Sequence, residues 1–69
     1  MGIINVKING NEFEFAEELN VSKLLEERKV TGTMFVVEKN LQIVQKEDYE
    51  KTTVKNGDVV EIVGFFGGG

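Results

Sequence analysis

The sequence contains no cysteine, histidine, proline or tryptophan. Without cysteine and histidine, the chain has no thiol nucleophile, no imidazole base and no soft metal ligand. Packing alone must stabilise the fold, because neither a disulfide nor a zinc site can reinforce it. The remaining polar groups are mainly carboxylates, lysines, hydroxyls and one tyrosine. We therefore expect a protein that is not itself an enzyme, with no catalytic side chain, no metal site and no cofactor of its own.

Other absences concern membranes and nucleic acids. No apolar run approaches the roughly 20 residues that a membrane helix needs. The first residues lack the basic stretch and the apolar region of a signal peptide, and Val6 does not fit the myristoylation pattern. The net charge of −4 disfavours binding to nucleic acid, which depends on neutralising phosphates. We expect a cytoplasmic protein that contacts neither membrane nor nucleic acid and whose acidic surface suits a basic protein partner.

The first part of the chain predicts a β-hairpin. Its 69 residues, 41% of them hydrophobic and 29% charged, indicate one folded domain. Residues 4–8 alternate apolar and polar side chains, the period of a half-buried strand. Asn9-Gly10 predicts a type I′ turn, and Phe13 and Phe15 then mark the returning strand, with its aromatic side chains facing inward.

The middle of the chain predicts a helix from about Val21 to Val30. Asn20 is its expected N-cap, and Gly32 is placed to terminate it in a left-handed conformation. The apolar run 34–37 predicts a strand covered on much of both faces.

The remainder predicts shorter pieces and one last strand. We expect a turn at 39–40, a short strand over 41–44, a single helical turn over 46–49 and a turn at 56–58. The last strand covers 59–63, in which Val60 and Ile62 face the core while Val59 and Val63 face away.

This order of elements predicts an α+β fold. A crossover through the helix separates the first strand from the last, so the simplest assembly is a mixed sheet packed on one helix. A sheet of four to five strands in this order is the ubiquitin-like β-grasp arrangement. We expect a β-grasp domain over residues 1–64 and a flexible, functional C-terminal tail over 65–69.

The chain resembles the sulfur carrier proteins of thiamine biosynthesis, the ThiS family. Four segments carry the resemblance: Val-Glu-Lys-Asn at 37–40 followed by Ile-Val at 43–44, the site of Tyr49, Asn-Gly-Asp-Val-Val-Glu-Ile-Val at 56–63, and the closing glycines Gly67, Gly68 and Gly69. The resemblance implies that Gly69 is the modified, sulfur-bearing residue. An adenylating enzyme similar to ubiquitin-activating enzymes would use ATP to activate the Gly69 carboxylate. A persulfide donor such as a cysteine desulfurase would then supply sulfur, and a thiazole synthase would accept it.

The last strand and the tail also predict a docking surface. Val59 and Val63 on the outer face, together with Phe65 and Phe66, are our candidates for binding the adenylating enzyme and the thiazole synthase, because adjacent exposed apolar side chains mark interfaces. Two alternatives stay open. The carrier could serve another pathway, as the small subunit of molybdopterin synthase or in cysteine, methionine or tRNA thiolation. The chain could also be a purely structural β-grasp interaction module.

Overall fold

The computed structural model describes residues 2–32 and 34–64 of the chain. The strands are β1 (Ile4–Ile8), β2 (Asn11–Phe15), β3 (Leu19–Asn20), β4 (Phe35–Lys39), β5 (Gln42–Val44), β6 (Thr53–Val54) and β7 (Val59–Gly64). One α-helix, α1 (Val21–Glu27), follows β3, and one 3-10 turn, η1 (Lys46–Asp48), follows β5. No helix in the described ranges has the length and apolar character needed to cross a membrane.

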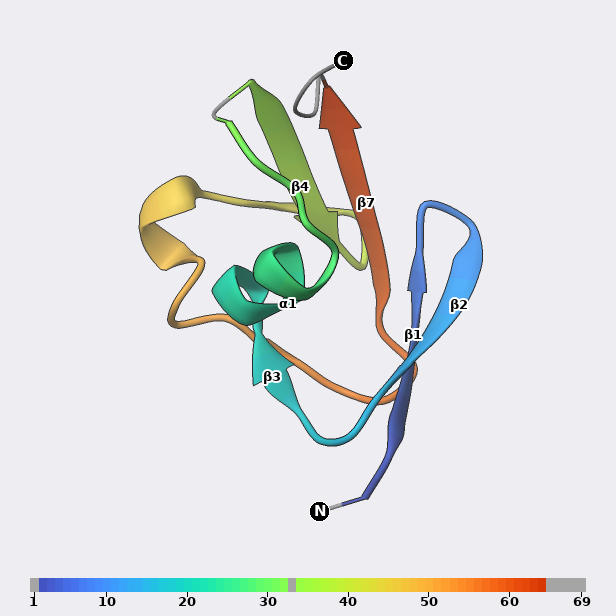
Figure 1. Cartoon of the computed structure of the whole chain (residues 1–69). Helices are drawn as coiled ribbons and strands as arrows, with labels where there is room; N and C mark the ends of the chain where they lie inside the picture. The colour runs from blue at the N-terminus through green and yellow to red at the C-terminus, as the bar shows by residue number, and fades with distance from the viewer. Residues whose placement is uncertain (1, 33, 65–69) are drawn as a thin grey trace.

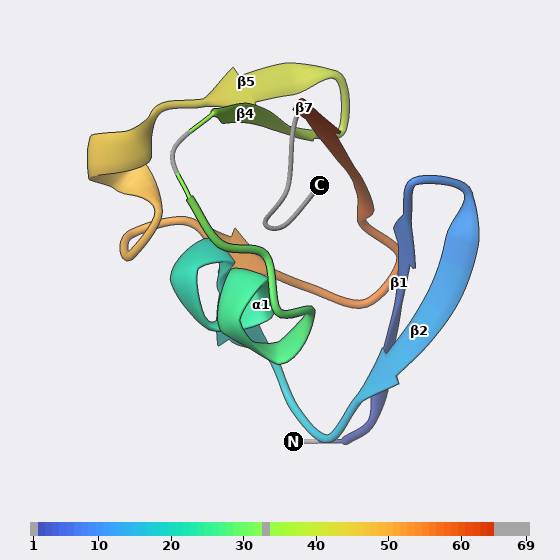
Figure 2. The same ribbon diagram turned by 45° about the horizontal axis from the view of Figure 1, so that its top comes forward.

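Five strands form a mixed sheet in the order β2-β1-β7-β4-β5. The β1–β7 pair is parallel, and the other neighbours are antiparallel. The strands β3 and β6 form a separate antiparallel ladder beside the helix. In Figures 1 and 2 the helix α1 lies against one face of the curved sheet. The predicted β-grasp arrangement is confirmed, and the small β3–β6 ladder is an addition to it.

The N-terminal hairpin follows the prediction closely. Residues of β1 alternate between buried and exposed, with Ile4, Val6 and Ile8 in the core. Asn9 and Gly10 have φ values of 49° and 87°, as a type I′ turn requires. The two phenylalanines of β2 are half-buried against the core, so the aromatic face does point inward.

The core lies between α1 and the inner face of the sheet. Its fully buried side chains come from the helix, from three strands of the large sheet and from β6. They are Val6, Val21, Leu24, Val37, Val54 and Val60. The ring of Tyr49 packs against the edge of this cluster and stacks on Phe35 with 6.5 Å between ring centroids. Burial raises the pKa of the Tyr49 phenol above its ordinary value.

The helix begins as predicted but ends earlier. The Asn20 side chain accepts a hydrogen bond from Lys23 N at 2.7 Å, which confirms the N-cap. The helix ends at Glu27 rather than near Val30. Lys29, with φ of 59°, is the left-handed residue, and Val30 N donates to Leu25 O at 2.9 Å in the Schellman pattern. The prediction that Gly32 terminates the helix is wrong, because Lys29 adopts that conformation first.

The prediction that the 34–37 strand is covered on both faces is also wrong. Val37 is fully buried under α1, but Val36 points to the other face and is 46% exposed. The physical reason is that the one helix covers a single face of the sheet, and the opposite face meets solvent. The following turn sits one residue later than predicted, at Asn40 and Leu41, whose φ values are 51° and 71°.

The strand β7 is held by two asparagine side chains. It pairs with β1 at only two positions, Val59 and Val60. Beyond these two positions, the side chain of Asn9 replaces the backbone of β1 as the hydrogen-bonding partner of β7. Asn9 Oδ1 accepts a hydrogen bond from Ile62 N at 2.7 Å, and Asn9 Nδ2 donates to Ile62 O at 3.0 Å. On the other side of β7, Asn40 Oδ1 accepts from Val59 N at 2.9 Å. Both asparagines are turn residues with positive φ, so the two hairpin turns fix β7 from both sides.

A carboxylate fixes the point where β7 begins. Asp58 accepts hydrogen bonds from Lys55 N at 2.8 Å and from Asn40 Nδ2 at 3.0 Å, and Lys39 Nζ lies 3.7 Å from it. Burial acts to raise the pKa of the Asp58 carboxyl, but these hydrogen bonds and the Lys39 charge outweigh burial and hold the pKa below its ordinary 3.8. The ionised form therefore stabilises the fold.

We expect Asn9→Gly to destabilise the protein by about 2 kcal/mol, since it removes two hydrogen bonds of about 1 kcal/mol each while still permitting positive φ. Urea unfolding measures this loss. Lys29→Gly is the matched control: it also replaces a positive-φ residue, but the Lys29 side chain makes no hydrogen bond within the described residues. The control should unfold at or above the wild-type midpoint. Equal midpoints for Asn9→Gly and wild type would contradict the role given to Asn9.

We expect Asp58→Asn to be less stable than wild type at neutral pH, with the difference shrinking in acid. Because the folded pKa of Asp58 lies below 3.8, its contribution is present above that pH and is lost as the pH falls through the folded pKa. Urea unfolding at neutral pH and at successively lower pH values tests this, with Glu14→Gln on the exposed side of β2 as control. A stability difference that stays constant over the whole range would disprove this account.

Candidate functional site

The described part of β7 runs from the middle of the sheet to Gly64. The predicted tail residues lie beyond it and outside the described residues: Phe65, Phe66, Gly67, Gly68 and Gly69. What the structure contributes is therefore the strand that leads to the tail and the surface beside that strand. Both depend on β7 occupying a central place between β1 and β4.

Gly64 is the last described residue, and only glycine fits there. Its φ is 137°, which side-chain-bearing residues rarely adopt. A Cβ at this position would collide with the carbonyl oxygen of Met34 and lie 2.7 Å from Phe35 Cα. The backbone of β7 thus passes unusually close to the start of β4 at Gly64. Gly64 is missing from the predicted site residues, although an isolated glycine within an apolar strand is itself a signal of close backbone approach.

Val59 and Val63 lie where the sequence predicts them, on the outer face of the sheet. They are 39% and 59% exposed. They are four positions apart along one strand, which is roughly 13 Å. Glu61 stands between them on the same face, so the two valines alone do not form one continuous apolar surface.

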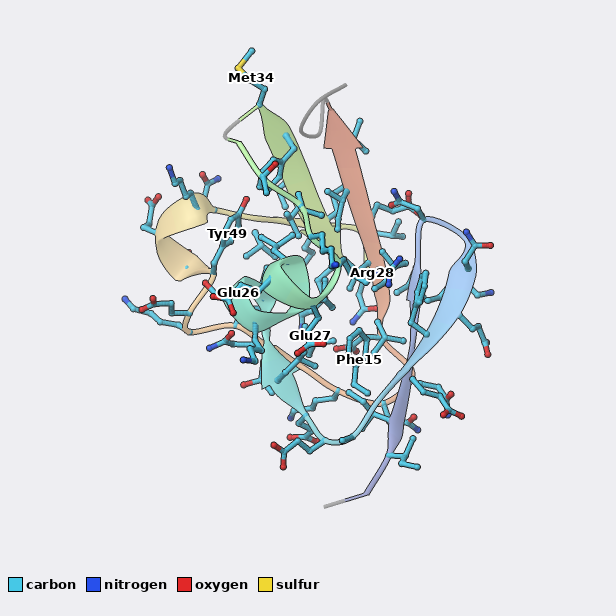
Figure 3. The ribbon with its side chains drawn as sticks, viewed as in Figure 1. Phe15, Glu26, Glu27, Arg28, Met34 and Tyr49 are labelled. Carbon is cyan, nitrogen blue, oxygen red and sulfur yellow. The ribbon has the colours of Figure 1, made fainter. Side chains whose placement is uncertain are left out.

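Neighbouring strands complete the apolar surface around Val63. Val36 on β4 is directly opposite Val63, and Ile43 on β5 lies diagonally from Val36. Met34 precedes β4 and projects away from the end of the strand, next to the end of β7 (Figure 3). We call Met34, Val36, Ile43 and Val63 the outer-face patch; all four are exposed.

Three members of the patch are absent from the sequence prediction. All four residues from Met34 to Val37 are apolar, so the composition of this run gives no sign that one face is open. The exposure of Val36 and Ile43 follows from the placement of a single helix, which is a property of the assembled fold.

Two carboxylates lie beside the outer-face patch. Glu38 on β4 and Glu61 on β7 are directly opposite each other in the antiparallel register. Both are half-buried. Among the described residues we find no group of three or more acidic side chains arranged to hold a metal ion. The pair is therefore a local concentration of negative charge on an otherwise apolar end of the sheet.

Comparison with known proteins gives consistent matches. The sequence model of the ThiS family matches residues 6–69. Over 65 residues the chain is 31% identical to the sulfur carrier protein ThiS of Bacillus subtilis, covering 93% of this chain and 98% of that protein. The crystal structure of a thiamine biosynthesis protein (ThiS) from Geobacter metallireducens superposes with a TM-score of 0.82 at 40% identity, over 96% of this chain and 100% of the other.

A further relative is much longer. The chain is 45% identical over 62 residues to a thiazole synthase of Paramagnetospirillum magneticum, and the match covers 90% of this chain. It spans 19% of that synthase, so the resemblance concerns a small segment of the longer protein.

We expect Gly64→Ala to destabilise the protein by about 1–3 kcal/mol, because the added Cβ must displace the backbone of β4. Amide hydrogen exchange should show faster exchange at Ile62 and Val63 than in wild type. Gly32→Ala is the matched control, since Gly32 also has a positive φ of 88°, but a Cβ added there would meet open space. If both variants lose the same stability, the close contact with β4 is not what requires glycine at 64.

Proposed function

The chain belongs to the ThiS family of small sulfur carrier proteins, and on that premise we propose that it carries sulfur for thiazole formation in thiamine biosynthesis. The sulfur is held as a thiocarboxylate on Gly69. The observation that carries the proposal is that the family match extends through the last glycine, over residues 6–69. The chain acts as a protein co-substrate, and other proteins supply the catalysis.

Three steps convert the Gly69 carboxylate into a sulfur donor. In the first, a carboxylate oxygen attacks the α-phosphorus of ATP on an adenylating enzyme, which releases pyrophosphate and forms an acyl-adenylate. In the second, the terminal sulfur of a cysteine persulfide attacks the carbonyl carbon and displaces AMP, which gives an acyl disulfide. In the third, a second thiol attacks the cysteine sulfur of this acyl disulfide, so that the thiocarboxylate leaves and the two thiol sulfurs remain joined as a disulfide. ATP is used by the adenylating enzyme, so the carrier needs no cofactor.

The composition of the chain is compatible with a carrier that supplies the reacting carboxylate while other proteins supply the catalytic groups. Apart from the reacting Gly69 carboxylate, the carrier contributes no acid, base or nucleophile, so a sequence without cysteine and histidine loses nothing. Glycines without β-carbons suit a narrow channel and leave the terminal carbonyl open to attack. The five residues after Gly64 extend at most roughly 16 Å, enough to enter the active site of an enzyme docked on the sheet.

Three partners follow from the proposal: an adenylating enzyme of the ubiquitin-activating type, a persulfide donor such as a cysteine desulfurase, and a thiazole synthase as acceptor. A thiazole synthase that itself contains a segment 45% identical to this chain supports the last of these. Val59 and the outer-face patch are the surface on which we place docking of the adenylating enzyme and the synthase.

The alternatives predict different acceptors or none. A carrier for molybdopterin, cysteine, methionine or tRNA thiolation would use the same activation chemistry, so adenylation alone does not separate it from the thiamine carrier. The names of the relatives favour thiamine. A structural β-grasp module would not be adenylated at all.

We expect Gly69→Ala, and equally the addition of one residue after Gly69, to abolish adenylation while leaving the fold intact, because the activating site must accept an unbranched terminus. ATP–pyrophosphate exchange with the adenylating enzyme measures the reaction, and circular dichroism verifies the fold. Gly2→Ala is the matched control, since Gly2 is exposed and a Cβ there meets open space. Normal thiocarboxylate formation in either tail variant would refute the proposal.

A further inference from the structure

The facing carboxylates Glu38 and Glu61 are unfavourable for the isolated protein. Like charges directly opposite each other on one sheet face repel and destabilise the strand pair. Both side chains are half-buried, which limits how far solvent can screen them. The ion pairs of the described residues join Lys23 to Glu26 and Lys39 to Asp58, so neither Glu38 nor Glu61 has a basic partner there.

Apolar side chains frame this carboxylate pair. Val36 and Val63 stand next to it along β4 and β7, towards the tail, and Ile43 lies directly beside Glu38 on β5. A cation that reached both carboxylates would therefore find acceptor oxygens on two adjacent strands and an apolar border beside them. Such a setting favours a group that is charged, planar and weakly hydrated.

We propose that Glu38 and Glu61 together bind the guanidinium of one arginine on the adenylating enzyme, with the outer-face patch covering apolar side chains around that arginine. The inference rests on the proposed function, since it assigns the surface by which the activating partner recognises this carrier. Arginine fits better than lysine because its five donors spread in a plane and can bridge two carboxylates, and because it is less strongly hydrated than an ammonium group.

Other occupants fit less well. A second copy of this chain would bring two carboxylate pairs together on one interface, which adds repulsion. A membrane or a nucleic acid is itself anionic. A metal ion would find two carboxylates and no third acidic ligand among the described residues.

The position on β7 explains why the partner is an enzyme that acts on the tail. Glu61 precedes Gly64 by three residues on the same strand, roughly 10 Å along it. An enzyme that receives the tail after Gly64 must cover this end of the sheet. An arginine reaching the carboxylates would set the orientation of the carrier at the same time.

The test uses Glu38→Gln, Glu61→Gln and the double variant, with the adenylating enzyme that activates the wild-type chain. We expect each single variant to raise the dissociation constant roughly tenfold, because each weakens a charge-assisted contact. The melting temperature of the free protein should stay the same or rise, because the repulsion is relieved. Isothermal titration calorimetry and thermal unfolding measure the two quantities.

Glu27→Gln is the matched control. It removes one charge from an exposed position on α1, on the opposite side of the sheet (Figure 3), and should leave the affinity unchanged. Loss of affinity in Glu27→Gln equal to that in Glu61→Gln would mean that net charge alone is recognised, and would overturn the proposal. So would Gln variants that bind as tightly as wild type, or that lose affinity and melting temperature together.

Substitutions on the enzyme identify the arginine. Among Arg→Ala variants of its carrier-binding surface, one should weaken binding of the wild-type carrier but cause little further loss with the double Gln variant. If every Arg→Ala variant lost as much affinity for the double Gln carrier as for the wild-type carrier, the proposal would be overturned. Dimerisation of the wild-type carrier through this face in sedimentation experiments would also overturn it. In each case, adenylation that depends on Gly69 would leave the proposed function standing.

Discussion

The hydrogen bonds between Asn9 and Ile62 are the contact on which the arrangement depends most. The ladder of β1 stops after Val60, and without the Asn9 side chain the second half of β7 would be fixed only by β4. On the β4 side, Asn40 Oδ1 likewise accepts a hydrogen bond from Val59 N. Asparagine suits both places because it tolerates positive φ and offers a donor and an acceptor in one short side chain. The strand that leads to the tail is thus positioned by two turns far from it in sequence.

The core and the proposed docking surface lie on opposite faces of the same sheet. The inner face, with Val37, Val60 and Ile62, packs under α1 and excludes water. The outer face carries an apolar patch and two carboxylates at facing positions, Glu38 and Glu61. A small domain can carry this combination because alternate residues of β4 and β7 point to different faces. At the end of the described part of β7, Gly64 lets the backbone approach β4 closely.

Local signals in the sequence were enough to predict the hairpin, the N-cap at Asn20, the inward positions of the last strand and the β-grasp order. The first three depend on residues within a few positions of one another, and the β-grasp order follows from the succession of elements. The error at the helix end is also local: Lys29 adopts a positive φ, and Val30 N donates to Leu25 O. The other errors involve distant parts of the chain. Val36 is exposed because no second layer covers it among the described residues. The need for glycine at 64 comes from β4, and the Glu38–Glu61 pair exists only in the paired strands.

The central claim is that the reactive group of this protein is the carboxylate at Gly69, carried by a domain that contributes no catalytic side chain. Mass spectrometry of the C-terminal peptide, after incubation with adenylating enzyme, ATP and a persulfide donor, tests it most directly. We expect a mass increase equal to the replacement of one oxygen by one sulfur, located on Gly69 by fragmentation. An unchanged mass, or sulfur located on any other residue, would contradict it.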